Sequence, residues 1–279
     1  MPVTDTLSTP PSVRRHALVT GGSAGIGIGI VRALCARGIM VSFCGRDFER
    51  GQAAERDFRS SGFAACFVAA DVTTDEGTTS LVAKALKNAP IDILVNNVGN
   101  PSNIAGATRP WLEVDSIDWE RTYYRNVINA KRLCDATVPA MCDRGWGRVV
   151  NISSAAGQQP GNEVPADYSV AKAALNALTM TLARAVAFTG VTVNTVTPGP
   201  ILTDAQRDWI VTMATNEKWE GGFDDWERRF IRDAMRLTVN RLGSPEDIGR
   251  AVAFLVAEEA DFITGENLRI DGGQTISAI

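Results

Sequence analysis

The chain has 279 residues, of which 45% are hydrophobic and 22% charged, and this composition suits one large α/β domain or at most two small ones. The formal net charge of −4 argues against a nucleic-acid surface, and no apolar run approaches the roughly 18 residues needed to cross a bilayer. His16 is the only histidine, which excludes a zinc site built on several histidines. Residues 1–13 are polar and Pro-rich, so they are predicted to be a disordered tail without an export signal. The five cysteines form no C-x-x-C pair, and a cytoplasmic location is expected.

A glycine-rich turn joins the first predicted strand, at residues 16–20, to a helix predicted at residues 28–37. The turn reads Thr20-Gly21-Gly-Ser-Ala-Gly25-Ile-Gly27. It places free backbone N–H groups and the positive end of a helix dipole at one point. In this strand–turn–helix context the pattern favours a pyrophosphate site over a merely flexible loop.

The second predicted strand, at residues 39–44, is followed by Gly45, Arg46 and Asp47. In dinucleotide-binding folds an acid at this strand end binds the ribose 2′-hydroxyl, whereas an arginine accommodates a 2′-phosphate. Gly45 stands where the acid is expected and Arg46 follows, which favours NADP(H). Asp47, one residue later, keeps NAD(H) as an alternative. If Arg46 does not bind a cofactor, it is a solvent-exposed arginine at the start of the next helix.

Two further predicted strands end in polar residues: residues 65–72 carry Asp71 at the strand end, and residues 90–99 lead into an Asn-Asn turn. Strands that alternate with helices at this spacing predict right-handed βαβ crossovers and a parallel sheet. A long helix is predicted over about residues 115–143. It contains Asn126, which is either a buried polar group with a role or a surface residue.

The stretch of residues 151–172 carries the candidate acid–base group. A buried strand is predicted at residues 148–153, and the helix after it holds Tyr168 and Lys172 on one face because they are four residues apart. An ammonium group beside a phenol favours the phenolate and lowers its pKa from about 10. Ser154, at the strand end, can hydrogen-bond a substrate oxygen placed against the phenol. Taken alone, Tyr-x-x-x-Lys is also typical of an ordinary exposed helix face.

Residues 203–240, called the lid segment below, differ in composition from the rest of the chain and follow a strand predicted at residues 191–196. They hold half of the tryptophans, interleaved with a run of arginines: Trp209, Trp219, Trp226, Arg228, Arg229, Arg232 and Arg236. An insertion of this kind beside a ligand-binding edge predicts a helical lid over an apolar substrate, with packing on a neighbouring subunit as the alternative. The arginines favour a solvated helix face over contact with an acidic carrier or an anionic substrate. A helix at residues 244–257 and a last strand and turn at residues 267–273 complete the chain.

The order of elements predicts an α/β fold: residues 14–279 form a single-domain Rossmann fold, with a doubly wound parallel sheet of about seven strands and helices on both faces. Several motifs occur in a specific order: Thr20-Gly21-x-x-x-Gly25-x-Gly27, Asp71, Asn96-Asn97-Val98-Gly99, Asn126, Ser154, Tyr168-x-x-x-Lys172 and Pro198-Gly199. Over about residues 15–273 this set resembles the classical short-chain dehydrogenase/reductase (SDR) family.

The resemblance implies a catalytic tetrad of Asn126, Ser154, Tyr168 and Lys172 and no metal site. It implies these cofactor-binding residues: Gly21, Ser23, Gly25, Ile26, Gly27, Arg46, Asp71, Val72, Asn97, Gly99, Tyr168, Lys172, Pro198, Gly199, Ile201 and Thr203. Three departures from the family pattern stand out. Ala24 stands where many NADP-preferring members carry a basic residue, so the cofactor preference rests mainly on Arg46. Val98 replaces the usual alanine, and the gap between the serine and Tyr168 is about one residue longer than the commonest form. That gap assigns Ser154 rather than Ser153.

The resemblance further implies an NADP(H)-dependent carbonyl reductase or alcohol dehydrogenase in which Tyr168 transfers the proton. Lys172 would lower the pKa of Tyr168 and hold the nicotinamide ribose, and Asn126 would hold a water. The tryptophans favour a bulky cyclic ketone over the linear chain of a 3-oxoacyl-carrier reductase. A homo-oligomer, dimer or tetramer, is expected. A dinucleotide-binding redox sensor is the alternative of a different class, and the intact acid–base residues disfavour it.

Overall fold

The computed structural model describes residues 14–100, 111–161 and 164–276, so the predicted tail at residues 1–13 lies outside the described residues. Within them, parallel strands form one seven-stranded sheet in the order β3-β2-β1-β4-β5-β6-β7. The strands are β1 (His16–Val19), β2 (Met40–Gly45), β3 (Ala65–Ala69), β4 (Ile93–Asn96), β5 (Gly147–Ile152), β6 (Val191–Pro198) and β7 (Asn267–Ile270). The order reverses between β1 and β4, where the ligand crevice of such sheets lies.

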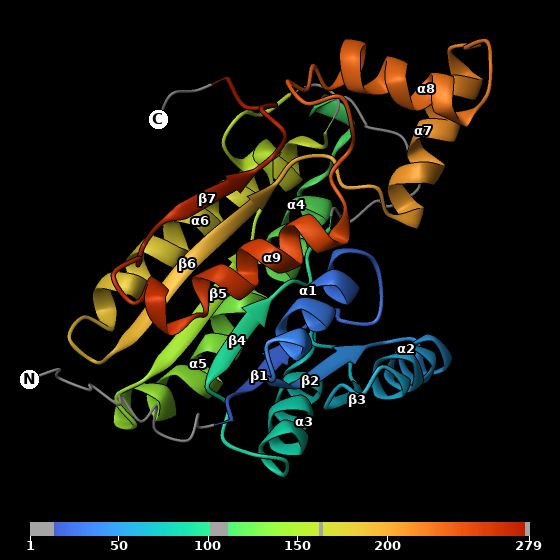
Figure 1. Cartoon of the computed structure of the whole chain (residues 1–279). Helices are drawn as coiled ribbons and strands as arrows, with labels where there is room; N and C mark the ends of the chain where they lie inside the picture. Colours follow the sequence, from blue (N-terminus) through green and yellow to red (C-terminus); the bar gives the residue numbers. More distant parts are fainter. Residues whose placement is uncertain (1–13, 101–110, 162–163, 277–279) are drawn as a thin grey trace, which may run out of the picture.

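Helices cover both faces of the sheet, as the sequence predicts (Figure 1). One face carries α1 (Gly25–Ala36), α2 (Phe48–Ser60) and α9 (Pro245–Leu255); the other carries α3 (Asp75–Leu86), α5 (Asn129–Asp143) and α6 (Ala166–Ala185). Short 3₁₀ turns lie at η1 (Trp111–Glu113), η3 (Ala155–Gly157) and η5 (Glu258–Ala260). None of the described helices is long and apolar enough to cross a membrane.

The core has two halves, one on each face of the sheet. Ala17 and Val19 of β1 belong to the half beneath α1 and α9, whereas Leu18 between them belongs to the half beneath α3 and α5. Because successive side chains of a strand point to opposite faces, both faces of the central strands are apolar. This explains why these strands are visible in the sequence as short continuous apolar runs.

The long helix predicted at residues 115–143 is continuous but not uniform. It consists of α4 (Ser116–Tyr123), a π-helical turn η2 (Tyr124–Ile128) and then α5. The π turn contains Asn126, which is buried. Single π turns inside α-helices are frequent at functional sites because they redirect one side chain.

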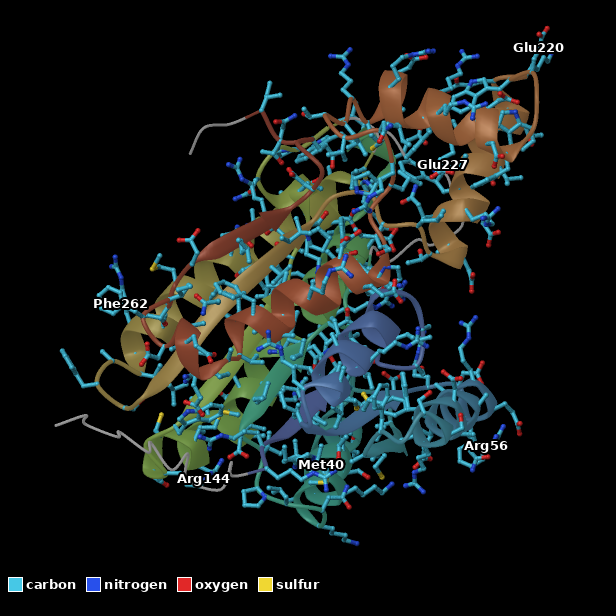
Figure 2. The ribbon with its side chains drawn as sticks, in the orientation of Figure 1. Met40, Arg56, Arg144, Glu220, Glu227 and Phe262 are labelled. Carbon is cyan, nitrogen blue, oxygen red and sulfur yellow. The ribbon has the colours of Figure 1, made fainter. Side chains whose placement is uncertain are left out.

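The lid segment folds as α7 (Asp204–Asn216), α8 (Phe223–Arg229) and a π turn η4 (Phe230–Ala234), beyond the carboxyl edge of the sheet (Figure 1). It has a small apolar core of its own, which includes Trp219 and Phe230. Glu220 lies at its outer end, at the opposite end of the molecule from Phe262 (Figure 2). Several aromatic residues of the lid segment thus pack against one another, and some of them also line the cleft described below.

Candidate active site

The glycine-rich turn between β1 and α1 adopts the backbone that its glycines permit. Gly21 and Gly25 have φ angles of 65° and 52°, in the left-handed region that favours glycine. At Gly27 a Cβ atom would lie 2.0 Å from the carbonyl oxygen of Gly21, so only glycine lets the helix start so close to the turn. Ala24, the residue before α1, gives the helix no side-chain cap. The first N–H groups of α1 thus remain open to an anion.

A groove of about 460 Å³ runs from this turn along the carboxyl ends of the strands. Most residues predicted to bind the cofactor line it: Gly21, Ser23, Gly25, Ile26, Arg46, Asp71, Val72, Asn97, Gly99 and Thr203. The groove has the size and the glycine-rich, arginine-bearing lining that a dinucleotide requires, so the residues present fit such a cofactor.

Other predicted cofactor residues lie elsewhere. Pro198 and Gly199 line a second cleft together with Tyr168. Ile201 is buried in the core beneath α1 and α9 and borders a third cavity, so it does not line the groove. Gly27 does not line the groove; it packs against the backbone of Gly21 and Gly22 within the turn.

Three charged residues of the groove were not predicted from the sequence: Arg50, Arg125 and Asp204. Arg50 lies in the first turn of α2, four residues after Arg46, and its Nη2 is 3.5 Å from Oδ2 of Asp204, the first residue of α7. Both Arg50 and Asp204 line the groove. The position of Arg50 in the first turn of the helix that follows Arg46 is the signal that could have indicated it.

Tyr168 and Lys172 lie together on α6, as their spacing predicts. Nζ of Lys172 is 5.5 Å from the centre of the Tyr168 ring and donates a hydrogen bond of 2.8 Å to the carbonyl oxygen of Ile152, the last residue of β5. Lys172 is almost fully buried. The lysine is thereby held rigidly between α6 and the carboxyl edge of the sheet.

The two adjacent serines point to different partners. Ser154 is hydrogen-bonded to Tyr168, and it lines the same cleft as the tyrosine. Ser153 is buried, and its hydroxyl donates to the backbone oxygen of Lys172 at 3.2 Å. Ser154 is therefore the serine that stands beside the phenol.

Asn126 faces Lys172 across Gly99. Its Nδ2 donates to the backbone oxygens of Thr122 and Asn100 at 2.8 and 3.0 Å, whereas Oδ1 is buried without a hydrogen-bond partner among the described residues. A Cβ atom on Gly99 would lie 2.4 Å from that Oδ1 and 2.7 Å from Nζ of Lys172. The amide oxygen and the ammonium group thus flank one small space that Gly99 keeps open. An acceptor left unpaired in a buried site marks a place for a further donor, such as a water.

Burial shifts the pKa values of the acid–base pair in opposite directions. Burial raises the pKa of Tyr168 to about 12, while its hydrogen bond to Ser154 favours the phenolate. Burial lowers the pKa of Lys172 to about 7. This differs from the sequence-based expectation that Lys172 lowers the pKa of Tyr168, because desolvation disfavours the charged form of both groups.

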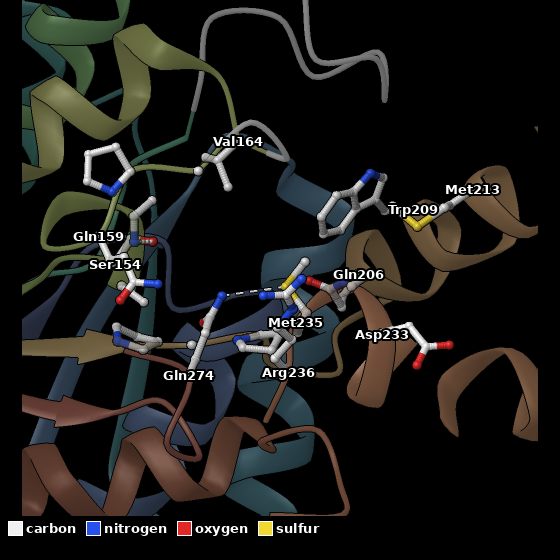
Figure 3. A pocket seen from close by; sticks show the side chains of 18 of the residues that line it. Ser154, Gln159, Val164, Gln206, Trp209, Met213, Asp233, Met235, Arg236 and Gln274 are labelled. Atoms are coloured by element: carbon white, nitrogen blue, oxygen red, sulfur yellow. Dashed lines mark hydrogen bonds between the residues drawn. The ribbon is translucent and has the colours of Figure 1, made fainter. Parts of the chain in front are cut away.

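The second cleft, of about 790 Å³, opens between the carboxyl edge of the sheet and the lid segment. Figure 3 shows Ser154 and Gln159 on one side of it and Trp209 and Met213 on the other. Since Tyr168 lies in its wall, a substrate carbonyl in this cleft can reach the phenol and Ser154.

Comparison with known proteins agrees with this geometry. The family model described as short chain dehydrogenase matches residues 15–213. The 3-oxoacyl-[acyl-carrier-protein] reductase FabG of Vibrio cholerae is 37% identical over 261 residues, which cover 92% of this chain and 96% of that protein. The acetoacetyl-CoA reductase of Cupriavidus necator is 33% identical over 264 residues, covering 93% and 98%. A crystal structure of an actinorhodin polyketide ketoreductase variant with NADPH is 30% identical, with a TM-score of 0.85 and coverage of 94% and 98%.

The chain belongs to the short-chain dehydrogenase/reductase family, and it is an oxidoreductase of the kind that acts on CH–OH and C=O groups.

Proposed function

We propose that the protein is an NADP(H)-dependent reductase that interconverts a bulky ketone and a secondary alcohol. The observation that carries this proposal is the placement of Ser154, Tyr168 and Lys172 between a dinucleotide-sized groove and a substrate-sized cleft. The bound cofactor would supply the hydride to the carbonyl carbon.

The protein's own residues handle the oxygen and its proton. Ser154 orients the carbonyl oxygen through a hydrogen bond, and Tyr168 donates its proton to the alkoxide that develops there. With a pKa of about 12, the Tyr168 phenol holds its proton throughout the neutral range, which suits an acid in the reducing direction. Lys172, together with a water held by the open Oδ1 of Asn126, would return a proton to the phenol.

Three features of the groove favour NADP(H) over NAD(H). A Cβ atom at Gly45, where an acid would bind the ribose, would lie 2.3 Å from Oγ of Ser23. Asp47, the other acid nearby, is engaged as the N-cap of α2 and accepts from the Arg50 N–H at 3.0 Å. Arg46 and Arg50 both line this end of the groove, where a 2′-phosphate would pair with guanidinium groups. The solved ketoreductase relative also binds NADPH.

The size of the cleft and its Trp and Met lining favour a bulky substrate, as does the structural similarity to a polyketide ketoreductase. A linear 3-oxoacyl thioester is the second candidate, because the relatives named above include an acetoacetyl-CoA reductase and a 3-oxoacyl-[acyl-carrier-protein] reductase.

The test compares initial rates with NADPH and NADH for a fused-ring ketone and a linear 3-oxoacyl thioester, in the wild type and in Arg46→Ala. The wild type should prefer NADPH and the ring ketone. Arg46→Ala should lower kcat/KM for NADPH by about tenfold and leave that for NADH nearly unchanged, because only NADPH has the phosphate.

Arg56→Ala is the matched control, since Arg56 lies exposed on the same helix α2 but outside the groove (Figure 2). Faster turnover with NADH in the wild type would overturn the cofactor proposal. A preference for the linear thioester would replace the bulky substrate with the second candidate.

A further inference from the structure

The lid segment holds five arginines, and they are not equivalent in the structure. Arg207 lies over the ring of Phe223, 3.9 Å from its centre. Arg228 pairs with Asp225 at 2.6 Å, and Arg232 pairs with Asp233 at 2.6 Å. Arg229 lies 4.0 Å from Asp233 and stacks over the ring of Trp219 at 4.7 Å. Four of the five guanidinium groups thus have a partner within the lid segment itself, as on a solvated helix face.

Arg236 is the exception. Its side chain is exposed and lines the substrate cleft, and no acidic partner lies within salt-bridge distance among the described residues. Figure 3 shows it next to Gln274 and Met235, which are hydrogen-bonded to each other, on the same cleft as Ser154. A cation directed into a ligand cleft without a partner is available to an anion that enters it.

The backbone of Arg236 strengthens this distinction. Its φ angle is 51°, in the left-handed region that costs a residue with a side chain free energy relative to glycine. The position closes the π turn η4, where Leu237 N–H donates to the Ile231 oxygen at 3.0 Å, and helix ends of this kind usually carry glycine. The chain keeps an arginine where glycine would be easier to accommodate, which points to a role for its side chain.

The two acids of the cleft are already engaged. Asp233 is paired with Arg232, and Glu217 accepts a hydrogen bond from the indole N–H of Trp219 at 2.8 Å. Apart from these groups, the lid side of the cleft is lined by Gln206, Trp209, Met213, Ala234 and Met235. Arg229 also lines it, but its guanidinium group lies over the Trp219 ring and 4.0 Å from Asp233. It therefore offers an apolar wall and one unpaired positive charge.

We propose that the substrate carries, besides its carbonyl, an anionic group that Arg236 binds while the apolar body lies against the lid segment. The group is a carboxylate of the substrate itself or a phosphate of a carrier arm, since both pair with a guanidinium fork. This proposal rests on the proposed function and names the substrate class for the same cleft.

Two matched substrate pairs test the proposal and separate the two sources of charge. The first is a fused-ring keto acid and its methyl ester. The second is a 3-oxoacyl thioester of 4′-phosphopantetheine and the same thioester of pantetheine, which lacks the phosphate. The quantity measured is the ratio of kcat/KM for the charged member to that for the neutral member, in the wild type, Arg236→Gln, Arg236→Gly and Arg228→Gln.

In one of the two pairs the wild type should prefer the charged member by about tenfold, the effect of one charge-assisted hydrogen bond in a partly exposed site. Arg236→Gln and Arg236→Gly should both bring the ratio near one through a higher KM, with kcat for the neutral member retained. Arg228→Gln, with its arginine in the lid but outside the cleft, should keep the preference. Arg236→Gly should melt no lower than the wild type, because glycine accepts the left-handed backbone freely.

A wild-type ratio near one in both pairs would overturn the proposal while turnover itself still supports a carbonyl reductase. A preference that survives in both Arg236 variants would also overturn it, since the charge would then be bound elsewhere. If none of the four compounds is reduced with NADPH, the proposed function fails and this inference fails with it.

Discussion

Replacing Tyr168 with Phe is expected to lower kcat about a thousandfold while the affinity for NADPH stays within a few fold of the wild type. The change removes the phenol oxygen that would donate the proton, and general acid catalysis contributes on the order of 10²–10⁴ in rate. The ring, which packs near Lys172, is retained. The measurement is steady-state reduction of a ketone, with cofactor binding followed separately by fluorescence titration.

Tyr123→Phe is the control for the loss of a phenol oxygen, because Tyr123 lies exposed on α4 and outside the cleft. It should keep full activity. If Tyr168→Phe itself keeps full turnover, Tyr168 is not the proton donor, and the proposed mechanism is wrong even if NADPH binds normally.

Replacing Lys172 with Met is expected to lower kcat by at least a hundredfold and also to change how stability depends on pH. Met fills the space of the lysine side chain but has no ammonium group. The group that would return a proton to Tyr168 is therefore absent. The same substitution removes a lysine whose pKa is lowered to about 7 by burial, well below its unfolded value of about 10.4.

Between these two pKa values the unfolded chain binds one proton more than the folded chain, so the lysine makes the free energy of unfolding of the wild type rise with pH. We expect Lys172→Met to exceed the wild type in stability at pH 6.5 and the difference to shrink by roughly 1–2 kcal/mol towards pH 8.5. Urea unfolding of both proteins measures it. The buried thiols of Cys35, Cys44 and Cys134, whose pKa values burial raises to about 12, are present in both proteins and cancel in the difference. A difference that does not vary with pH would show that Lys172 is not desolvated.

The parallel sheet could be predicted because its strands leave simple marks in the sequence. β1, β2 and β4 are mostly runs of buried apolar residues, and β5 and β6 are buried strands in which valines stand among polar residues. Each predicted run overlaps its strand, although β6 continues to Pro198, beyond the predicted end at residue 196. Glycines that must adopt positive φ, such as Gly21 and Gly25, are equally visible. These marks are local, so one sequence suffices to find them.

The remaining features depend on contacts between distant segments. The π turn that turns Asn126 toward Lys172 has no signature in the local residues. The partners of the lid arginines could not be predicted from the sequence, because they depend on where Asp225, Asp233 and Trp219 lie in the folded segment. The raised pKa of Tyr168 was missed because the spacing shows the nearby lysine but not the burial of both groups. The predicted tetramer or dimer and the cytoplasmic location stay predictions.

The most direct test of the central claim is the reaction of the wild-type protein with NADPH and a fused-ring ketone, with cofactor absorbance followed and the product identified. If this claim holds, one secondary alcohol forms for each NADPH oxidised. Tight binding of NADPH without reduction of any ring ketone or 3-oxoacyl thioester would contradict it, and it would favour a dinucleotide-binding sensor instead.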